Sequence, residues 1–268
     1  MTDVAWALGI ALGTYLVLAY LVLPMFWRHY EHLPPMSEFP KYTRTTGGLQ
    51  GDPLNVALVG TEREIERAFA ADGWSAARPI TVRSSLGIVE SVVLDRPDPT
   101  APVSVLLLWG RKEDLAFERC VGRSARQRHH VRFWKTEVQT EDGRMLWVGA
   151  ATFDVGVELG HRTGQVTHRI APDIDSERNR LMETLDGAGQ LIRRYAVTGI
   201  GPTLSGRNGG GDRYVSDGEL YVGVLANEHT AGSARAERLP SPPLVVVKDG
   251  LWAWLSPALS SRPTSPPQ

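Results

Sequence analysis

The 268-residue chain has one cysteine, Cys120, and almost no net charge. A single cysteine cannot form an intramolecular disulfide, so the sequence gives no redox evidence for an extracellular or periplasmic location. The formal net charge of −1 means that the chain lacks the excess of basic residues with which nucleic-acid-binding domains contact phosphates. We therefore expect no nucleic-acid partner.

Several motifs of catalysis and cofactor binding are also absent. The chain contains no Gly-x-Ser-x-Gly nucleophile elbow, no Rossmann glycine fingerprint, no phosphate-binding loop and no pair of CxxC motifs. These absences argue against serine hydrolases, dinucleotide-dependent enzymes and zinc ribbons. The apolar share of 42% is ordinary for a folded protein and allows one large domain or two small ones.

Residues 4–27 are mostly apolar and include no charged residue. At ~1.5 Å per residue, a helix of this length exceeds the ~30 Å hydrocarbon core of a bilayer. We expect a transmembrane helix rather than a cleaved signal peptide, because no positive charge precedes it and the run exceeds the ~7–15 apolar residues of a signal. The lipid bilayer is then a partner through this helix, and residues 28–50 form a linker.

The few charges near this segment predict its orientation. Arg28, Lys41 and Arg44 follow it, whereas no lysine or arginine precedes it. By the positive-inside tendency, the chain is a single-pass cell-membrane protein whose globular domain lies in the cytoplasm.

Residues 51–225 are predicted to form one α+β domain. The apolar run Asn55–Val59, bounded by proline and glycine, is typical of a buried strand. Thr61 and Glu64 match a capping box, which predicts that a helix begins there and ends near Asp72. Further along, helical spacing predicts a helix over 80–94, and a continuous apolar run predicts a central strand over 103–109.

A β-hairpin is predicted next, with strands over 127–138 and 144–159. The turn between them contains Asp-Gly, a strong hairpin signal. Side chains alternate along a strand, so Trp147 and its apolar partners face the core and Asp154 faces the opposite side. His130 shares that opposite side, where it meets Asp154 if the strand register allows.

The remaining chain is predicted to add strands, one helix and a flexible tail. Strands are predicted over residues 165–170, 191–197 and 219–225, and a helix is predicted over 173–186. Residues 203–212 are predicted to form a mobile loop. Residues 226–268 are predicted to be a flexible tail that includes an amphipathic helix over 243–256, with a hairpin arm as the alternative. The predicted fold is a mixed, mostly antiparallel sheet with a few packing helices, preceded by one transmembrane helix.

Four segments have an unusual composition and carry a family resemblance. The first two are Gly110 to Phe117, which ends in Asp114-Leu-Ala-Phe117, and Arg126-Gln-Arg-His-His-Val-Arg-Phe-Trp134. The other two are Trp147-Val-Gly-Ala-Ala-Thr-Phe-Asp154 and Thr167-His168, which leads into Asp173-Ile-Asp175. Together they resemble the LssY C-terminal domain family over roughly Gly51 to Leu225. Domains of this family often follow multi-pass membrane modules similar to DedA-type proteins or type 2 phosphatidic acid phosphatases. The resemblance implies no assigned activity. Many members have a second histidine where this chain has Arg169.

The candidate polar site gathers histidines and aspartates from the hairpin and the segment after it: His130, Asp154, His168, Asp173 and Asp175. Imidazole and carboxylate are suitable ligands for zinc or manganese, and a bound divalent metal lowers the pKa of its water toward ~7. A metal-dependent hydrolase of a lipid-linked or phosphate-bearing substrate is one hypothesis, with His130, Asp154 and His168 as metal ligands. Their spacing matches no known metal motif.

The same residues also have a structural interpretation. Asp173 or Asp175 caps the helix that begins near Ser176, Asp154 pairs with Arg132 or Arg169, and the histidines are hydrogen-bonded within the sheet.

A binding domain is the function that we favour from the sequence. Guanidinium groups bind phosphate through two parallel hydrogen bonds, and four arginines lie near the candidate polar site: Arg126, Arg128, Arg132 and Arg169. These residues predict an accessory or binding domain of a bacterial cell envelope, with an anionic lipid, an envelope intermediate or a membrane protein as its partner.

Overall fold

The computed structural model describes residues 2–22, 39–77, 105–122, 127–159, 166–198, 201, 203–232 and 235–260. The helix predicted over 80–94 lies outside these residues. Within them, strands outnumber helices and pair mostly antiparallel, as the sequence predicts for an α+β fold.

One large sheet forms the body of the molecule. Its strands are β3 (Val56–Gly60), β4 (Ser75–Ala76), β7 (Leu115–Cys120), β8 (Arg128–Gln139), β9 (Met145–Leu159), β10 (Val166–Ile170), β11 (Leu191–Val197), β14 (Leu220–Leu225) and β15 (Glu237–Arg238). They lie in the order β15-β11-β14-β3-β9-β8-β7-β4, and β10 pairs with the far part of β9. Only β14–β3 and β11–β15 pair in parallel among these described strands.

Two smaller sheets accompany the large one. The first contains β1 (Tyr42–Thr45), β2 (Gln50–Pro53), β5 (Leu106–Leu108) and β6 (Arg111–Lys112), in the order β2-β1-β5-β6. The second is a hairpin of β12 (Thr203–Arg207) and β13 (Arg213–Asp217). The prediction of a mobile loop over 203–212 is therefore wrong, because five consecutive residue pairs join β12 to β13.

Helix α3 (Glu62–Ala71) forms as its sequence predicts. The Thr61 hydroxyl accepts a hydrogen bond from the Glu64 amide, and the Glu64 carboxylate accepts one from the Thr61 amide, so both halves of the capping box are made. Gly73 follows with φ +75°, the left-handed conformation that glycine adopts without a steric penalty. The buried face of α3 contains Ile65 and Phe69 and packs on the large sheet.

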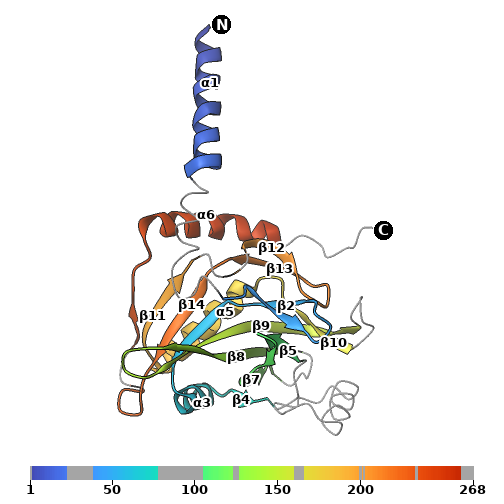
Figure 1. Cartoon of the computed structure of the whole chain (residues 1–268), viewed down its shortest axis with the longest axis vertical. Coiled ribbons are helices and arrows are strands. Elements are labelled where there is room, and N and C mark those ends of the chain that lie inside the picture. The colour runs from blue at the N-terminus through green and yellow to red at the C-terminus, as the bar shows by residue number, and fades with distance from the viewer. Residues whose placement is uncertain are drawn as a thin grey trace.

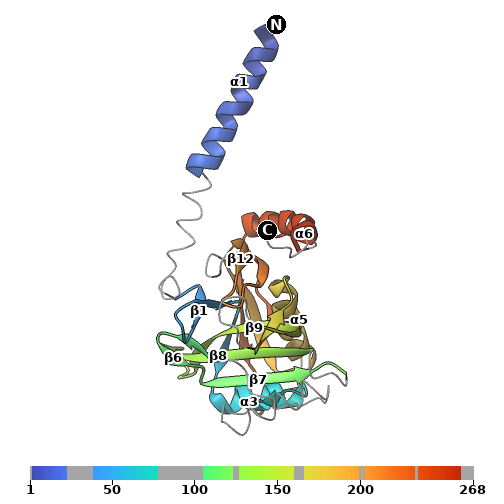
Figure 2. The same cartoon turned by 90° about the vertical axis from the view of Figure 1, so that its right-hand side faces the viewer.

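Three further helices are described: α1 (Thr2–Val17), which continues as a short π-helix over Leu18–Val22, α5 (Ile174–Gly187) and α6 (Pro243–Ser260). Figures 1 and 2 show α3 and α6 at opposite ends of the globular body, with α1 standing beyond α6. Helix α6 covers the region in which a helix over 243–256 is predicted, so this part of the predicted tail is ordered structure docked on the domain.

The N-terminal prediction is not supported. Helix α1 and its π-helical continuation end at Val22, short of the predicted end at residue 27, and residues 23–27 are outside the described chain. Among the residues described, none of the helices combines the length and the apolar character needed to cross a membrane.

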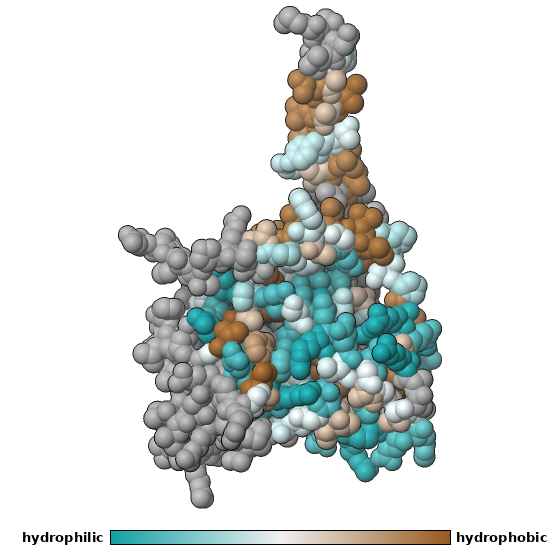
Figure 3. Space-filling view, turned by 180° about the vertical axis from the view of Figure 1, so that it is seen from behind, coloured by the Kyte–Doolittle hydropathy of each residue, from teal (hydrophilic) through white to brown (hydrophobic). Residues whose placement is uncertain are grey.

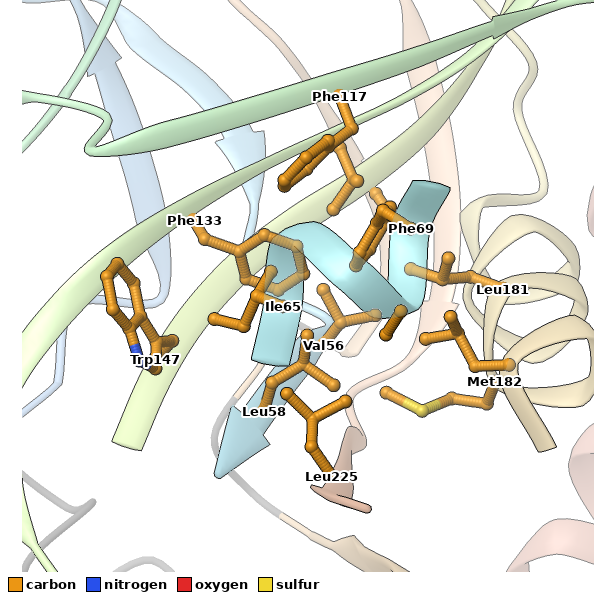
Figure 4. Packing of buried hydrophobic residues seen from close by; sticks show 14 of the residues in the cluster. Val56, Leu58, Ile65, Phe69, Phe117, Phe133, Trp147, Leu181, Met182 and Leu225 are labelled. Atoms are coloured by element: carbon orange, nitrogen blue, oxygen red, sulfur yellow. The ribbon is translucent and has the colours of Figure 1, made fainter. Parts of the chain in front are cut away.

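Both faces of the large sheet are buried. On one face, Phe133 and Trp147 pack with the side chains of α3 and α5, as Figure 4 shows. On the other face, Trp134 and Val148 pack against Leu106 and Leu108 of β5. The sequence predicts only the first of these faces as core, because the second is covered by β1, β2 and β5, whose packing no local pattern reveals.

Candidate functional site

The β8–β9 hairpin brings the central site residues together. Its register pairs Arg128 with Asp154 and His130 with Thr152, so these four side chains lie on one face of the sheet. This is the face predicted from the alternation of the two strands, and the side chains of Asp154 and Thr152 have no exposed surface.

An ion-pair network begins at Glu118 on β7. Arg128 donates from Nη1 to Glu118 Oε2 at 2.6 Å and from Nε to Asp154 Oδ2 at 3.0 Å. The three groups are at most 2% exposed. Burial lowers the pKa of Arg128, but the attraction of Asp154 and Glu118 outweighs that effect, so the pKa is raised and the guanidinium stays charged. Asp154 therefore pairs with Arg128, a partner that the sequence analysis does not suggest.

His130 continues the network. Its Nδ1 lies 3.1 Å from Asp154 Oδ1, and its Nε2 lies 2.7 Å from the Thr152 hydroxyl. Burial acts to lower the pKa of His130, and Arg132 acts in the same direction. The carboxylates of Asp154 and Asp52 together raise that pKa by more, so the imidazole is protonated more readily than a free one.

Arg132 joins His130 to the four-stranded sheet that contains β2. Its Nη1 lies 2.9 Å from His130 Nε2 and 3.3 Å from Asp52 Oδ2 on β2. In the neutral imidazole, Nε2 accepts the hydrogen bond that Arg132 donates. When Nε2 carries a proton, the Thr152 hydroxyl at 2.7 Å accepts its hydrogen bond. Two cationic groups then lie side by side, with Asp52 Oδ2 4.0 Å from Nε2.

A cavity of about 60 Å³ adjoins these groups. Since ~10–15 Å³ of such volume holds one water molecule, the cavity has room for several waters or one small ionic group. Its lining combines polar side chains of the network with the loop between β12 and β13: Asp52, Arg128, His130, Arg132, Asp154 and residues Asn208 to Gly210 are among the lining residues.

The loop over the cavity depends on glycine. A Cβ atom on Gly209 would lie 2.8 Å from Thr45 Cγ2 and 2.9 Å from the Gln50 carbonyl oxygen, so no larger residue fits without a shift of the backbone. Asp212 accepts a hydrogen bond from the Ile170 amide and thereby ties the loop to β10. The cavity is consequently enclosed by segments that are far apart in the sequence.

The two remaining aspartates lie elsewhere. Asp173 is the N-cap of α5 and accepts hydrogen bonds from the amide and hydroxyl of Ser176. Asp175 accepts from the Asp217 amide at 2.8 Å and from Trp252 Nε1 at 3.1 Å, beneath α6. Neither residue lines the cavity of His130, and the helix-cap interpretation of Asp173 is confirmed.

Other predicted residues are placed only in part. The backbone of His168 pairs with Val157 in β10, but its side chain is not among those described. Arg126 also lies outside the described residues, and Arg169 is exposed. No group of three His, Cys, Asp or Glu side chains in the described part of the chain is arranged to hold a metal ion, so the metal-site hypothesis depends on His168.

The opposite face of the hairpin carries a second histidine. His129 Nδ1 lies 2.7 Å from Glu177 Oε2 of α5, and the pair borders a pocket of about 450 Å³ together with Asp173 and Ser176. The adjacent histidines thus point to opposite faces, as strand alternation predicts.

Within the described residues, the four sequence segments that carry the resemblance fall on β6 of the four-stranded sheet, on β7 to β10 of the large sheet and on the start of α5. A family model described as the LssY C-terminus matches residues 36–220, which is more than half of the chain. The chain belongs to the LssY C-terminal domain family. Comparisons with curated proteins and with solved structures gave no match.

Some residues of the site in this LssY-family domain are not predicted from the sequence. Glu118 had a usable signal, because it is a charged residue that alternates with the core residue Phe117 along β7. Asp52 and Asn208 had none, since both reach the cavity only through the packing of β2 and of the β12–β13 hairpin around it.

Proposed function

We propose that this LssY-family domain is a binding domain, and that the cavity beside His130 and Arg132 receives a small oxyanion. The observation that carries the proposal is the distance of 2.9 Å between Arg132 Nη1 and His130 Nε2 at the cavity wall. Once His130 is protonated, both groups are cationic, and Asp52 Oδ2 lies 3.3 Å from Arg132 Nη1 and 4.0 Å from His130 Nε2. An oxyanion in the cavity adds a second negative partner for this pair of cations.

The surrounding carboxylates support this assignment by holding the donors in place. Asp154 lies against Nδ1 of His130, and Asp52 lies against Nη1 of Arg132. A ligand group positioned by buried, ion-paired side chains meets donors whose rotamers are already restricted, which lowers the entropy lost on binding. The small cavity favours one phosphate- or carboxylate-sized group over a whole substrate.

Binding is expected to be linked to pH. Because an anion favours the protonated imidazole, its binding raises the pKa of His130 further, and affinity decreases as the pH rises above that pKa. Sulfate is a suitable probe, because its own charge does not change between pH 6 and pH 8.

The test is thermal unfolding of the full chain in sodium sulfate against sodium chloride of equal ionic strength. A ligand that binds the folded state alone stabilises it by RT ln(1 + [L]/Kd). We expect sulfate to raise the Tm of the wild type at pH 6 and to raise it less at pH 8. Arg132→Gln should lose this increment, whereas Arg193→Gln, which removes an exposed ion pair with Glu237, should keep it.

Equal stabilisation of the wild type and Arg132→Gln, or none of the wild type, would contradict the proposal. If Arg132→Gln does not fold, His130→Gln serves instead, and calorimetric titration of the wild type with sulfate gives a direct measurement. Short-chain phosphatidic acid, compared with inorganic phosphate and with short-chain phosphatidylcholine, distinguishes a lipid headgroup from a free anion.

The cellular setting of this function is part of the proposal. An envelope-associated accessory role, a lipid or membrane-protein partner and a location at the cell membrane with the domain in the cytoplasm stay predictions from the sequence. So does the bilayer as the partner of the N-terminal helix.

A further inference from the structure

Helix α6 contacts the domain through its polar side. Lys248 Nζ lies 2.5 Å from Glu219 Oε1, and Trp252 Nε1 donates to Asp175 Oδ2 at 3.1 Å. Val245, on the same side of the helix, is buried. At ~3.6 residues per turn these positions follow one face, so the contacts describe a docked side that runs along the helix.

The other side of α6 is apolar and exposed. It carries Val246, Val247, Leu251, Trp254 and Leu255, which are 42–78% exposed, with Trp254 the most exposed. The charged residues of the helix are Lys248 and Asp249, and both are half-buried on the docked side. The outward side therefore carries no charge along the whole helix.

This arrangement is the reverse of the usual surface helix. A helix on a water-soluble domain places its apolar stripe on the core and its charged residues in water. In α6 the charged and hydrogen-bonding groups face the protein, and valine, leucine and tryptophan face outward. A continuous exposed patch of this kind marks an interaction surface.

The position of α6 indicates what it faces. Figures 1 and 2 show α6 lying across the end of the body from which α1 stands out, and Figure 3 shows hydrophobic surface on α1 and at that end of the body. Large side chains along α1 are exposed as well, among them Trp6, Leu8, Ile10 and Leu12. Two exposed apolar helices thus lie on the same side of the molecule.

We propose that the outward side of α6 lies in the interfacial layer of a lipid bilayer, with the helix axis parallel to the membrane surface. An interfacial helix buries its apolar face ~5–10 Å into the boundary between headgroups and acyl chains. Tryptophan suits this depth because its ring is apolar and its N–H reaches water. A protein partner fits less well, since such interfaces are ringed by polar groups and the outward side of α6 presents none.

The orientation of α6 then sets the orientation of the domain. Contacts through Lys248 and Trp252 hold the helix firmly to Glu219 and Asp175, so a membrane-bound α6 places the α3 end of the body farthest from the lipid (Figure 2).

Site-directed spin labelling of the full chain tests this proposal without requiring α1 to be removed. Cys120→Ser removes the natural thiol, and Leu251→Cys places a nitroxide on the outward side of α6. Glu66→Cys places the matched control on the exposed face of α3 at the opposite end. The chain is bound to phosphatidylcholine vesicles, and collisions with oxygen and with a water-soluble nickel complex are measured.

At position 251 we expect the nickel complex to collide several-fold less often than at position 66, and oxygen more often. Val247→Cys should behave like Leu251→Cys, which guards against a local effect of one label. Equal nickel accessibility at positions 251 and 66 would overturn the proposal. Protection that persists without vesicles and accompanies a dimeric mass would overturn it as well, because a second copy of the chain would then cover α6.

Discussion

The two faces of the β8–β9 hairpin are buried to the same extent but by different chemistry. One face packs Phe133 and Trp147 against α3 and α5, with the His129–Glu177 pair at its edge. The other face holds Trp134 and Val148 at one end and the network of Arg128, Asp154 and His130 at the other. The first face is mostly apolar and carries one buried polar pair, whereas the second buries a network of several charged groups.

This difference shows where function is to be sought. Moving charged groups out of water is unfavourable, and well-packed apolar residues often stabilise a core as well as a buried ion pair does. A network beside a cavity is therefore explained better by ligand binding than by stability alone, and the following changes test that contrast.

The largest effect is expected for Asp154→Ala on the charged face. It leaves the buried Arg128 with one carboxylate partner fewer, and breaking a buried ion pair costs ~3–5 kcal/mol of unfolding free energy. Urea unfolding measures the loss. Asp142→Ala, which removes an exposed ion pair with Arg144 in the hairpin turn, should leave the free energy of unfolding nearly unchanged. Similar values for the two variants would mean that the network is not closed to solvent.

A smaller effect is expected for Glu177→Gln on the opposite face. The substitution keeps the shape of the side chain and weakens its contact with His129, for an expected loss of ~1–3 kcal/mol. Sulfate should stabilise this variant as much as the wild type, because Glu177 and the cavity of Arg132 lie on different faces of the sheet. Loss of the stabilisation by sulfate in Glu177→Gln would indicate that sulfate binds on the face of His129 and Glu177, and would contradict a site at Arg132.

Local patterns predict much of this fold. The capping box of Thr61 and Glu64, the Asp-Gly turn and strand alternation each depend on residues close in sequence, and α3 and the hairpin form as predicted. Alternation also brings His130 and Asp154 together.

Long-range packing accounts for what the sequence does not predict. Asp52 contacts Arg132 only because β2 packs over the large sheet. Asp173 and Asp175 lie away from the cavity of His130, because at the start of α5 they form hydrogen bonds with Ser176 and Asp217 instead. The apolar spacing of α6 is visible in the sequence, yet spacing alone does not say whether that side faces the protein or its surroundings.

The smallest stability effect is expected from pH. The pKa of His130 is raised in the folded state, so its contribution to stability is complete below the ordinary value of ~6.5 and is lost as the pH rises through the folded pKa. His130→Gln should remove this part of the pH dependence, which urea unfolding at several pH values measures. A variant whose stability follows pH as the wild type does would contradict the raised pKa.

The comparison with the variant is needed because other groups titrate nearby. Burial raises the pKa of Asp175 to about 6 and that of Glu219 to about 7. Deprotonation of these two carboxyls therefore also lowers the stability of the folded protein as the pH rises toward neutrality. Both are present in the wild type and in His130→Gln, and their contribution cancels in the difference.

The most direct test of the binding site is the NMR titration of the histidine side chains with and without sulfate. The account predicts that the pKa of His130 lies above ~6.5 and rises further when sulfate is added. Sulfate should leave the signals of His129, which lies on the opposite face of the sheet, unchanged. A titration curve of His130 that sulfate leaves unchanged would contradict the claim that His130 and Arg132 form an anion-binding site.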